Sequence, residues 1–268
     1  MTFARLLASA AIATALAAGP AAAKDWDVVR IGTEGAYPPF NNLTSSGELV
    51  GFDVDIAKAL CTQMEVKCEF VTQDWDGMIP ALKANKFDAI IASMSITDER
   101  KKEVDFTNKY YNTPPALAVP KDSSLTAPDK GSDVVATMAD ALDGKALGAQ
   151  SSTTHSNYAE AKFPDADLRL YPTPDEYKLD LENGRLDAAV DDIVVLSDWI
   201  DSDEGGCCKI LTPLPIDPEI NGEGIGIAVR KENQDLKEML NKAIVAIRED
   251  GTYQKINDKY FSFDVYGD

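Results

Sequence analysis

The strand and helix signals of this chain run through one βαβαβ series and then begin again. Apolar runs at 28–32, 67–73 and 87–93 are typical of buried strands, and periodic patterns at 51–64 and 76–86 predict the helices between them. Strands that alternate with helices favour a mostly parallel sheet with helices on both faces. This alternation limits the possible folds more strongly than any single motif in the chain.

A second series of the same kind follows. Strand signals at 145–150, 168–172 and 185–192 flank helical patterns at 151–163 and 173–184. The stretch KANKFDAIIAS of the first series aligns with LENGRLDAAVD of the second. The aligned pairs are Phe87 with Leu186, Asp88 with Asp187, Ser93 with Asp192, and residues 32–34 with 148–150. The chain is therefore predicted to form an α/β fold of two lobes with similar topology.

A stretch with three prolines, 112–123, and a polar one to about 133 follow the first series, and a stretch rich in proline and glycine, 211–224, follows the second. They predict two crossings between the lobes. After them come a strand and a helix with the apolar face Leu236, Leu240, Ala243, Ile244 and Ile247. With two crossings, this last segment returns to the first lobe. We expect lobe 1 to comprise residues 24–112 and 221–268, and lobe 2 to comprise residues 113–220.

Residues 1–23 are predicted to be a cleaved secretory signal peptide. They carry one cation, Arg5, then an apolar run rich in alanine and leucine, and small residues precede Lys24. A buried helix or a membrane anchor is the alternative, but the run is short and Gly19-Pro20 interrupts it. No later stretch approaches the ~20 apolar residues that a membrane span needs. We therefore expect the protein in the periplasm.

The chain is strongly acidic. Its net charge is −19, and because Arg5 is the only charge in residues 1–23, the remainder carries −20. Such a protein is a poor partner for nucleic acid or an anionic membrane. A cationic or zwitterionic small ligand is compatible with this charge.

The four cysteines form two close pairs. In an oxidising compartment we expect Cys61 and Cys68 to bridge a helix and the following strand, which would contribute roughly 2–3 kcal/mol of stability. Cys207 and Cys208 are adjacent and could bond to each other, stay reduced or pair elsewhere, since four cysteines allow three pairings. The chain has one histidine and no CxxC, so we expect no metal and no cofactor.

Polar side chains follow the predicted strands of both lobes. Ligands of open α/β sheets lie beyond the carboxyl ends of the strands, so these side chains are candidates for one binding cleft. The lobe 1 candidates are Glu34, Tyr37, Trp75, Ser93, Ser95 and Arg100, and the lobe 2 candidates are Gln150, Thr154, His155 and Asp192.

This set fits the needs of an α-amino acid. Arg100 can fork onto a carboxylate through two charge-assisted hydrogen bonds, and Asp192 can accept from an ammonium. Glu34, Tyr37 and Trp75 suit a long cationic side chain held between rings. Taken singly, each has a plainer interpretation as a surface, packing or strand-end residue. The prediction therefore depends on their convergence.

The chain resembles the periplasmic polar amino-acid-binding proteins of ABC importers, particularly the lysine/arginine/ornithine- and histidine-binding branch. The resemblance is carried by RIGTEGAYPPF, GELVGFDVDIAKALC, DWDGMIPALKANKFDAIIASMSITDERKKEVDFT, GRLDAAVDD and DGTYQKINDKYFSFDVYG. It implies a two-lobed fold of type II that closes on one amino acid, with each lobe a mixed sheet flanked by helices and two hinge crossings between them.

The resemblance also implies roles by position. Arg100 and Thr154, with Ser95 beside them, match the carboxylate binders, and Asp192 and Ser93 match the ammonium binders. Tyr37 and Trp75 match the aromatics that flank the ligand side chain, and Cys61–Cys68 matches the family's disulfide.

Four positions depart from the pattern of that branch. Glu34 stands where aspartate is usual, Ala92 where a serine often contacts the side chain, Gln150 for an apolar residue and His155 for a glutamine. The loss of a polar contact at 92 and the new donors at 150 and 155 could suit a larger or doubly acidic arginine conjugate.

We therefore expect a monomeric solute-binding protein, not an enzyme, that captures arginine, ornithine or lysine and delivers it to a membrane permease. One alternative ligand is an arginine-derived opine of the nopaline or octopine type. A dehydratase on the same scaffold is a further alternative, but the sequence shows no evident nucleophile–base pair.

Overall fold

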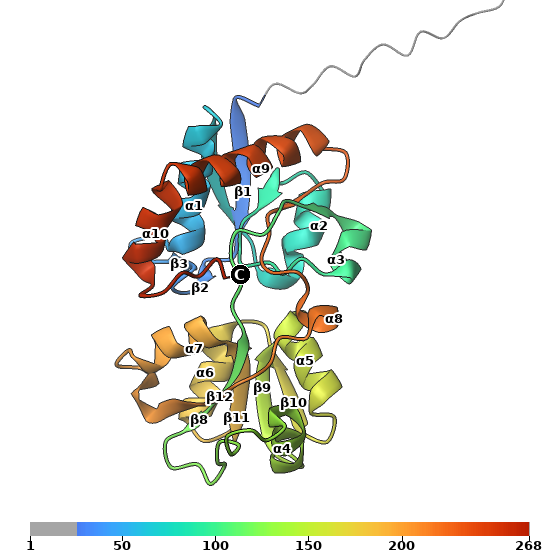
Figure 1. The fold of residues 1–268 in the computed structure, drawn as a ribbon, viewed down its shortest axis with the longest axis vertical. Helices are drawn as coiled ribbons and strands as arrows, with labels where there is room; N and C mark the ends of the chain where they lie inside the picture. The colour runs from blue at the N-terminus through green and yellow to red at the C-terminus, as the bar shows by residue number, and fades with distance from the viewer. Residues whose placement is uncertain (1–25, 268) are drawn as a thin grey trace, which may run out of the picture.

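The computed structural model describes residues 26–267, which form two lobes joined by two chain crossings (Figure 1). The predicted signal peptide, residues 1–23, lies outside the described residues. Within residues 26–267, no helix is long and apolar enough to cross a membrane.

The first lobe is built on a five-stranded sheet in the order β5-β1-β6-β13-β7. Its strands are β1 (Val28–Thr33), β5 (Lys67–Thr72), β6 (Ala89–Ile90), β7 (Asp105–Phe106) and β13 (Ala228–Val229). β1 is parallel to β5 and β6, whereas β13 is antiparallel to β6 and β7. The helices are α1 (Phe52–Gln63), α2 (Met78–Lys83), α3 (Asp98–Glu103), α9 (Gln234–Glu249) and α10 (Thr252–Tyr260), with the 3-10 turn η1 (Trp75–Gly77). The last segment of the chain thus returns to this lobe.

The second lobe carries a sheet of similar topology in the order β10-β9-β11-β8-β12. Its strands are β8 (Pro115–Pro120), β9 (Ala146–Gln150), β10 (Asp167–Tyr171), β11 (Ala188–Asp192) and β12 (Cys208–Pro213). Its helices are α4 (Val134–Ala141), α5 (Thr154–Lys162), α6 (Pro174–Glu182) and α7 (Ile193–Ile200), with the 3-10 turn η2 (Gly205–Cys207). Helices cover both faces of each sheet, as the alternating pattern predicts (Figure 1).

The internal repeat is visible in the strand register. Gly32 of β1 lies beside Ile90 of β6, and Gly148 of β9 lies beside Ala189 of β11. The aligned acids also match, because Asp88 accepts from the backbone N–H of Arg30 and Asp187 from that of Ala146. Equivalent residues therefore occupy equivalent places in the two lobes.

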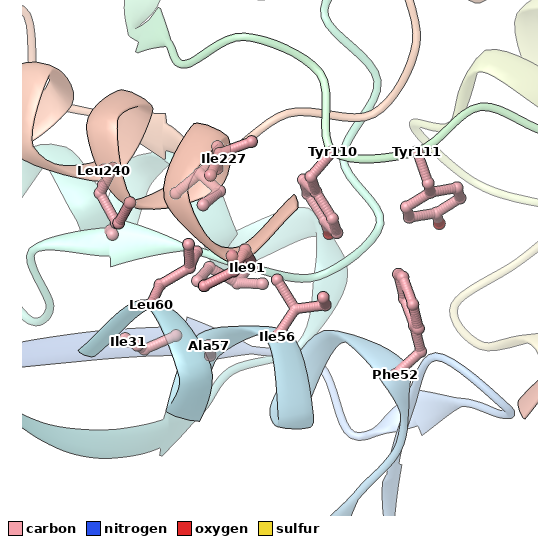
Figure 2. Packing of buried hydrophobic residues seen from close by; sticks show 14 of the residues in the cluster. Ile31, Phe52, Ile56, Ala57, Leu60, Ile91, Tyr110, Tyr111, Ile227 and Leu240 are labelled. Carbon is pink, nitrogen blue, oxygen red and sulfur yellow. The ribbon is translucent and has the colours of Figure 1, made fainter. Parts of the chain in front are cut away.

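The larger apolar core of the first lobe packs α1 and α9 onto the sheet. Figure 2 shows Phe52, Ile56, Ala57 and Leu60 of α1 facing Ile31 and Ile91, with Leu240 of α9 closing the cluster. All five residues predicted for the apolar face of α9 are buried. These side chains recur every three or four residues, as expected for the 3.6-residue period of a helix that buries one face.

Two parts of the sequence prediction need correction. Residues 112–123 were expected to be a crossing, but 115–120 form β8, which lies between β11 and β12 and is antiparallel to both. Its prolines occupy the first and last positions of the strand, where the loss of an N–H donor is tolerated. The small sheet of β2 (Ala36–Tyr37), β3 (Asn41–Leu43) and β4 (Leu49–Val50) was not predicted, because strands this short carry little periodicity.

The crossings are therefore shorter than expected. On the lobe 1 side, Tyr111 and Ile225 pair as an antiparallel bridge, and on the lobe 2 side the N–H of Leu214 donates to the carbonyl of Pro115 (2.8 Å). The chain runs through 112–114 in one direction and returns through 214–224, which includes the short helix α8 (Pro218–Asn221). The lobe boundaries given from the sequence stay a prediction.

The structure contains two disulfides. Cys61 of α1 bonds to Cys68 of β5 with a Cα–Cα distance of 5.9 Å, which confirms the expected bridge. Cys207 and Cys208 bond to each other, which selects one of the three pairings left open.

Gly32, one of the aligned glycines, has no room for a side chain, and this predicts a loss of stability on substitution. A Cβ atom there would lie 2.6–2.7 Å from three ring atoms of Phe87, which is fully buried. We expect Gly32→Ala to lower the free energy of unfolding by about 1–3 kcal/mol through overpacking. Gly206→Ala is the control, because a Cβ at that position meets nothing within 4 Å. Urea unfolding of both variants checks this, and equal midpoints for the two would contradict it.

Candidate functional site

The candidate site is a cavity between the lobes, at the carboxyl ends of strands from both sheets. It holds about 580 Å³ of space not filled by protein atoms, including the part that opens to solvent. All eleven residues predicted from the sequence line it: Glu34, Tyr37, Trp75, Ala92, Ser93, Ser95, Arg100, Gln150, Thr154, His155 and Asp192. Their roles toward a ligand stay a prediction.

Six further residues line the cavity and were not predicted. They are Tyr111, Asn112, Thr113, Thr153, Asn221 and Ile225. Most of them lie in or beside the two crossings, which the sequence identified only as connections. Segments that cross between two lobes pass the opening of the cleft and therefore line it. The predicted crossings could have identified most of these residues on that ground.

Arg100 is the fixed cation of the cavity wall. Thr97 caps α3 through a hydrogen bond from the Arg100 N–H (3.2 Å). The guanidinium donates to the carbonyls of Ser95 (3.1 Å) and Ser152 (3.2 Å) and lies over the Trp75 ring, 5.3 Å from its centroid. None of the residues in 26–267 forms an ion pair with it. Burial lowers the pKa of Arg100 to about 10, so it stays charged at neutral pH.

Asp192 is a buried carboxylate at the end of β11 and caps α7. It accepts hydrogen bonds from the N–H of Val194 (2.8 Å) and from the hydroxyl of Thr113. Burial nevertheless raises its pKa to about 6. The aligned Ser93, at φ 55°, donates its hydroxyl proton to Asp53 (2.9 Å). Ser93 therefore offers only acceptor lone pairs to the cavity, which suits an ammonium as Asp192 does.

Glu34 and Gln150, a second aligned pair, meet across the cleft. The Gln150 amide donates to Glu34 Oε1 (2.7 Å) and to the carbonyl of Pro172 (3.0 Å). Burial raises the pKa of Glu34 to about 7, against the effect of the Gln150 hydrogen bond. Glu34 therefore changes charge close to neutral pH when the cavity is empty of cations.

Several contacts join the lobes around the cavity. The Trp75 indole N–H donates to the carbonyl of Ser152 (3.1 Å), and the hydroxyls of Ser95 and Thr154 lie 3.3 Å apart. Ser151 donates to the carboxylate of Asp76 at 3.2–3.3 Å. The structure is therefore a closed form, in which the cavity is enclosed by both lobes.

Asp191 was missed by the sequence analysis. It is 2 % exposed and accepts from the hydroxyls of Tyr37 and Tyr177, each at 2.5 Å, while His155 Nδ1 lies 3.0 Å from its Oδ1. Although its own burial opposes this, these contacts lower the pKa of Asp191 to about 2. Burial lowers the pKa of His155, but the Asp191 carboxylate outweighs it, so the net direction is upward.

The described part of the chain holds no group of three or more His, Cys, Asp or Glu side chains placed to bind a metal ion. The cavity instead offers one guanidinium, an imidazole, two lining carboxylates, hydroxyls and aromatic rings. This arrangement of charges between two lobes is complementary to a small zwitterionic or cationic molecule.

The class defined by this fold and site is that of two-lobed solute-binding proteins. Residues 29–263 match the family of bacterial extracellular solute-binding proteins, family 3. The chain belongs to this family.

Relatives of known ligand support this assignment. The chain is 48% identical over 242 residues to the L-arginine-binding protein of Pseudomonas aeruginosa, which covers 89% of this chain and 90% of the relative. It is 40% identical to the lysine/arginine/ornithine-binding periplasmic protein of Escherichia coli (strain K12), over 90% of each. Among solved structures, an ancestral arginine-binding protein bound to arginine has a TM-score of 0.78 and 36% identity, covering 88% of this chain and 99% of that one.

Proposed function

We propose that this protein captures a cationic L-amino acid, arginine first and ornithine or lysine next, in the periplasm and delivers it to the permease of an ABC importer. The observation that carries the proposal is the charge set of the cavity. Arg100, without an ion-pair partner in residues 26–267, can receive the α-carboxylate, while Asp192 and Glu34 can each receive a cation. The names of two relatives, an L-arginine-binding and a lysine/arginine/ornithine-binding protein, support the same class of ligand.

The charge balance supports a ligand of net charge +1. Two carboxylates line the cavity, those of Glu34 and Asp192, against the one guanidinium of Arg100. Asp191 lies behind the wall and contacts His155. One negative charge is left over, which arginine, ornithine or lysine neutralises. Because unpaired buried charge is costly, a ligand that completes the balance is favoured.

Each residue that lines the cavity is assigned the part of the ligand that its side chain can bind. The Arg100 fork, with the hydroxyls of Ser95 and Thr154 beside it, binds the carboxylate, and Asp192 with Ser93 binds the ammonium. Glu34 binds the guanidinium or terminal amine, which Trp75 and Tyr37 flank. We infer that the lobes open by bending near 112–115 and 217–223, that the protein is exported with residues 1–23 as its signal peptide, and that it acts as a monomer.

An arginine-derived opine is the second candidate. The observation that favours it is His155, a raised-pKa imidazole on the cavity wall in addition to Arg100, which could pair with a second carboxylate. Ala92 leaves space where a hydroxyl would otherwise stand. We infer a binding protein and not an enzyme, in line with the binding function in the names of these relatives.

A thermal-shift panel of the twenty amino acids with nopaline and octopine tests the ligand. A ligand at 100-fold over Kd adds roughly 2.7 kcal/mol of stability, which corresponds to roughly 5–10 °C in Tm for a chain of this size. We expect the largest shift with arginine, ornithine or lysine. A large shift with an opine and none with these three would contradict the first choice.

The carboxylate role of Arg100 is tested by Arg100→Lys. Lysine keeps the charge but not the planar fork, so we expect the Kd for arginine to rise about 10- to 100-fold in calorimetry. Arg185→Lys is the control, because Arg185 is exposed on lobe 2 and pairs with Asp180. Equal Kd values for the two variants would overturn the role given to Arg100.

The acids predict a pH dependence of binding. Since a bound cation favours ionised Glu34 and Asp192, with pKa values of about 7 and 6, affinity for arginine should fall as pH is lowered from 8 to 5.5. Glu34→Gln should weaken binding and remove the part of the profile near pH 7, whereas exposed Glu48→Gln should leave the profile unchanged. Calorimetry across this range measures it, and a flat wild-type profile would refute the assignment.

A further inference from the structure

Four donors surround the carboxylate of Asp191. Oδ1 accepts from the Tyr37 hydroxyl (2.5 Å) and from the backbone N–H of Asp192 (2.7 Å), and lies 3.0 Å from His155 Nδ1. Oδ2 accepts from the Tyr177 hydroxyl (2.5 Å). A carboxylate has about four lone-pair positions, two on each oxygen, so the three donors at Oδ1 leave no position there for another donor, while Oδ2 keeps one. Asp191 itself does not line the cavity.

The four donors come from different lobes. Asp192, Tyr177 of α6 and His155 of α5 belong to the lobe that holds Asp191 itself, on β11. Tyr37 belongs to β2 of the first lobe, where its ring stacks on Phe40 at a centroid distance of 6.1 Å. Three of the contacts are therefore internal to one lobe, and the fourth exists only while the lobes touch.

Asp191 also fixes the state of a residue that does line the cavity. A carboxylate can only accept, so His155 Nδ1 carries a proton toward it. Nε2 is then the ring nitrogen left for a group in the cavity. In this way one buried carboxylate holds two side chains of the cavity wall, Tyr37 from one lobe and His155 from the other.

We propose that Asp191 is a positioning residue that couples ligand binding to closure, because its bond with Tyr37 adds to the stability of the closed form without touching the ligand. The proposal rests on the proposed function, in which the lobes part when the cavity is empty. In the open form water would replace the Tyr37 hydroxyl at Oδ1. Closure exchanges that water for the phenol at a buried carboxylate, where a charge-assisted hydrogen bond is stronger than the same bond in water.

The test compares two phenols on the same carboxylate. Tyr37→Phe removes only the contact that crosses the cleft and keeps the ring that packs on Phe40. Tyr177→Phe removes a contact of equal length, 2.5 Å, that stays within the second lobe. Kd for arginine is measured by calorimetry and Tm by calorimetry or circular dichroism, without ligand and with it.

We expect Tyr37→Phe to weaken arginine binding about 10- to 100-fold while the Tm of the ligand-free protein stays at the wild-type value. We expect Tyr177→Phe to lower the ligand-free Tm by roughly 3–12 °C with a much smaller change in Kd. In an Asp191→Asn background, the effect of Tyr37→Phe on Kd should shrink, since the shared carboxylate is gone.

Two results would overturn the proposal. One is a Tyr37→Phe variant that binds arginine as tightly as the wild type. The other is that Tyr37→Phe and Tyr177→Phe change Kd and the ligand-free Tm in the same proportion. That result is expected if Asp191 only stabilises the fold. Arginine binding by the wild type tests the proposed function, and the comparison of the two phenols tests Asp191, so the two ideas fail separately.

Discussion

The structure depends on the meeting of the carboxyl ends of strands from two sheets at one cavity. In each lobe the first strand and the strand beside it deliver polar residues to that edge, as open α/β sheets do. Because the lobes repeat one topology, the delivered residues come in aligned pairs. Glu34 opposes Gln150 at hydrogen-bond distance, and Ser93 and Asp192 both line the cavity, each from its own lobe.

The cavity combines buried charges that the protein does not balance internally. Asp88, by contrast, is a buried acid satisfied by Arg30 and Arg230, and it serves the packing of the first lobe. Arg100 has carbonyls and an aromatic ring around it but no carboxylate partner within residues 26–267. Burial raises the pKa values of Glu34 and Asp192 above their usual range. Such a cavity is costly when empty and is stabilised by a ligand of complementary charge.

Much of this organisation could be predicted from the sequence, because it follows from local patterns. The repeat of Phe87 and Leu186 predicted two similar lobes, and the structure places each against the glycine of its neighbouring strand. Strand ends predicted the cavity residues, since parallel strands leave their carboxyl ends at one edge. β8 was missed because its small apolar residues between prolines resemble a linker.

Asp191 could not be predicted because its role depends on three side chains distant in sequence. Adjacent Asp191 and Asp192 look alike in the chain, yet successive strand residues point to opposite faces. One side chain lines the cavity and the other lies behind it, among Tyr37, His155 and Tyr177. Only the folded arrangement separates the two, and only the closed lobes bring Tyr37 into contact.

The proposed function requires that the two lobes close on a cationic amino acid. Small-angle X-ray scattering of residues 24–268, with and without arginine, measures this closure in solution. We expect the radius of gyration to fall to the value of the closed structure when arginine is added, and to stay unchanged with glutamate. An unchanged radius of gyration at an arginine concentration that saturates binding would contradict it.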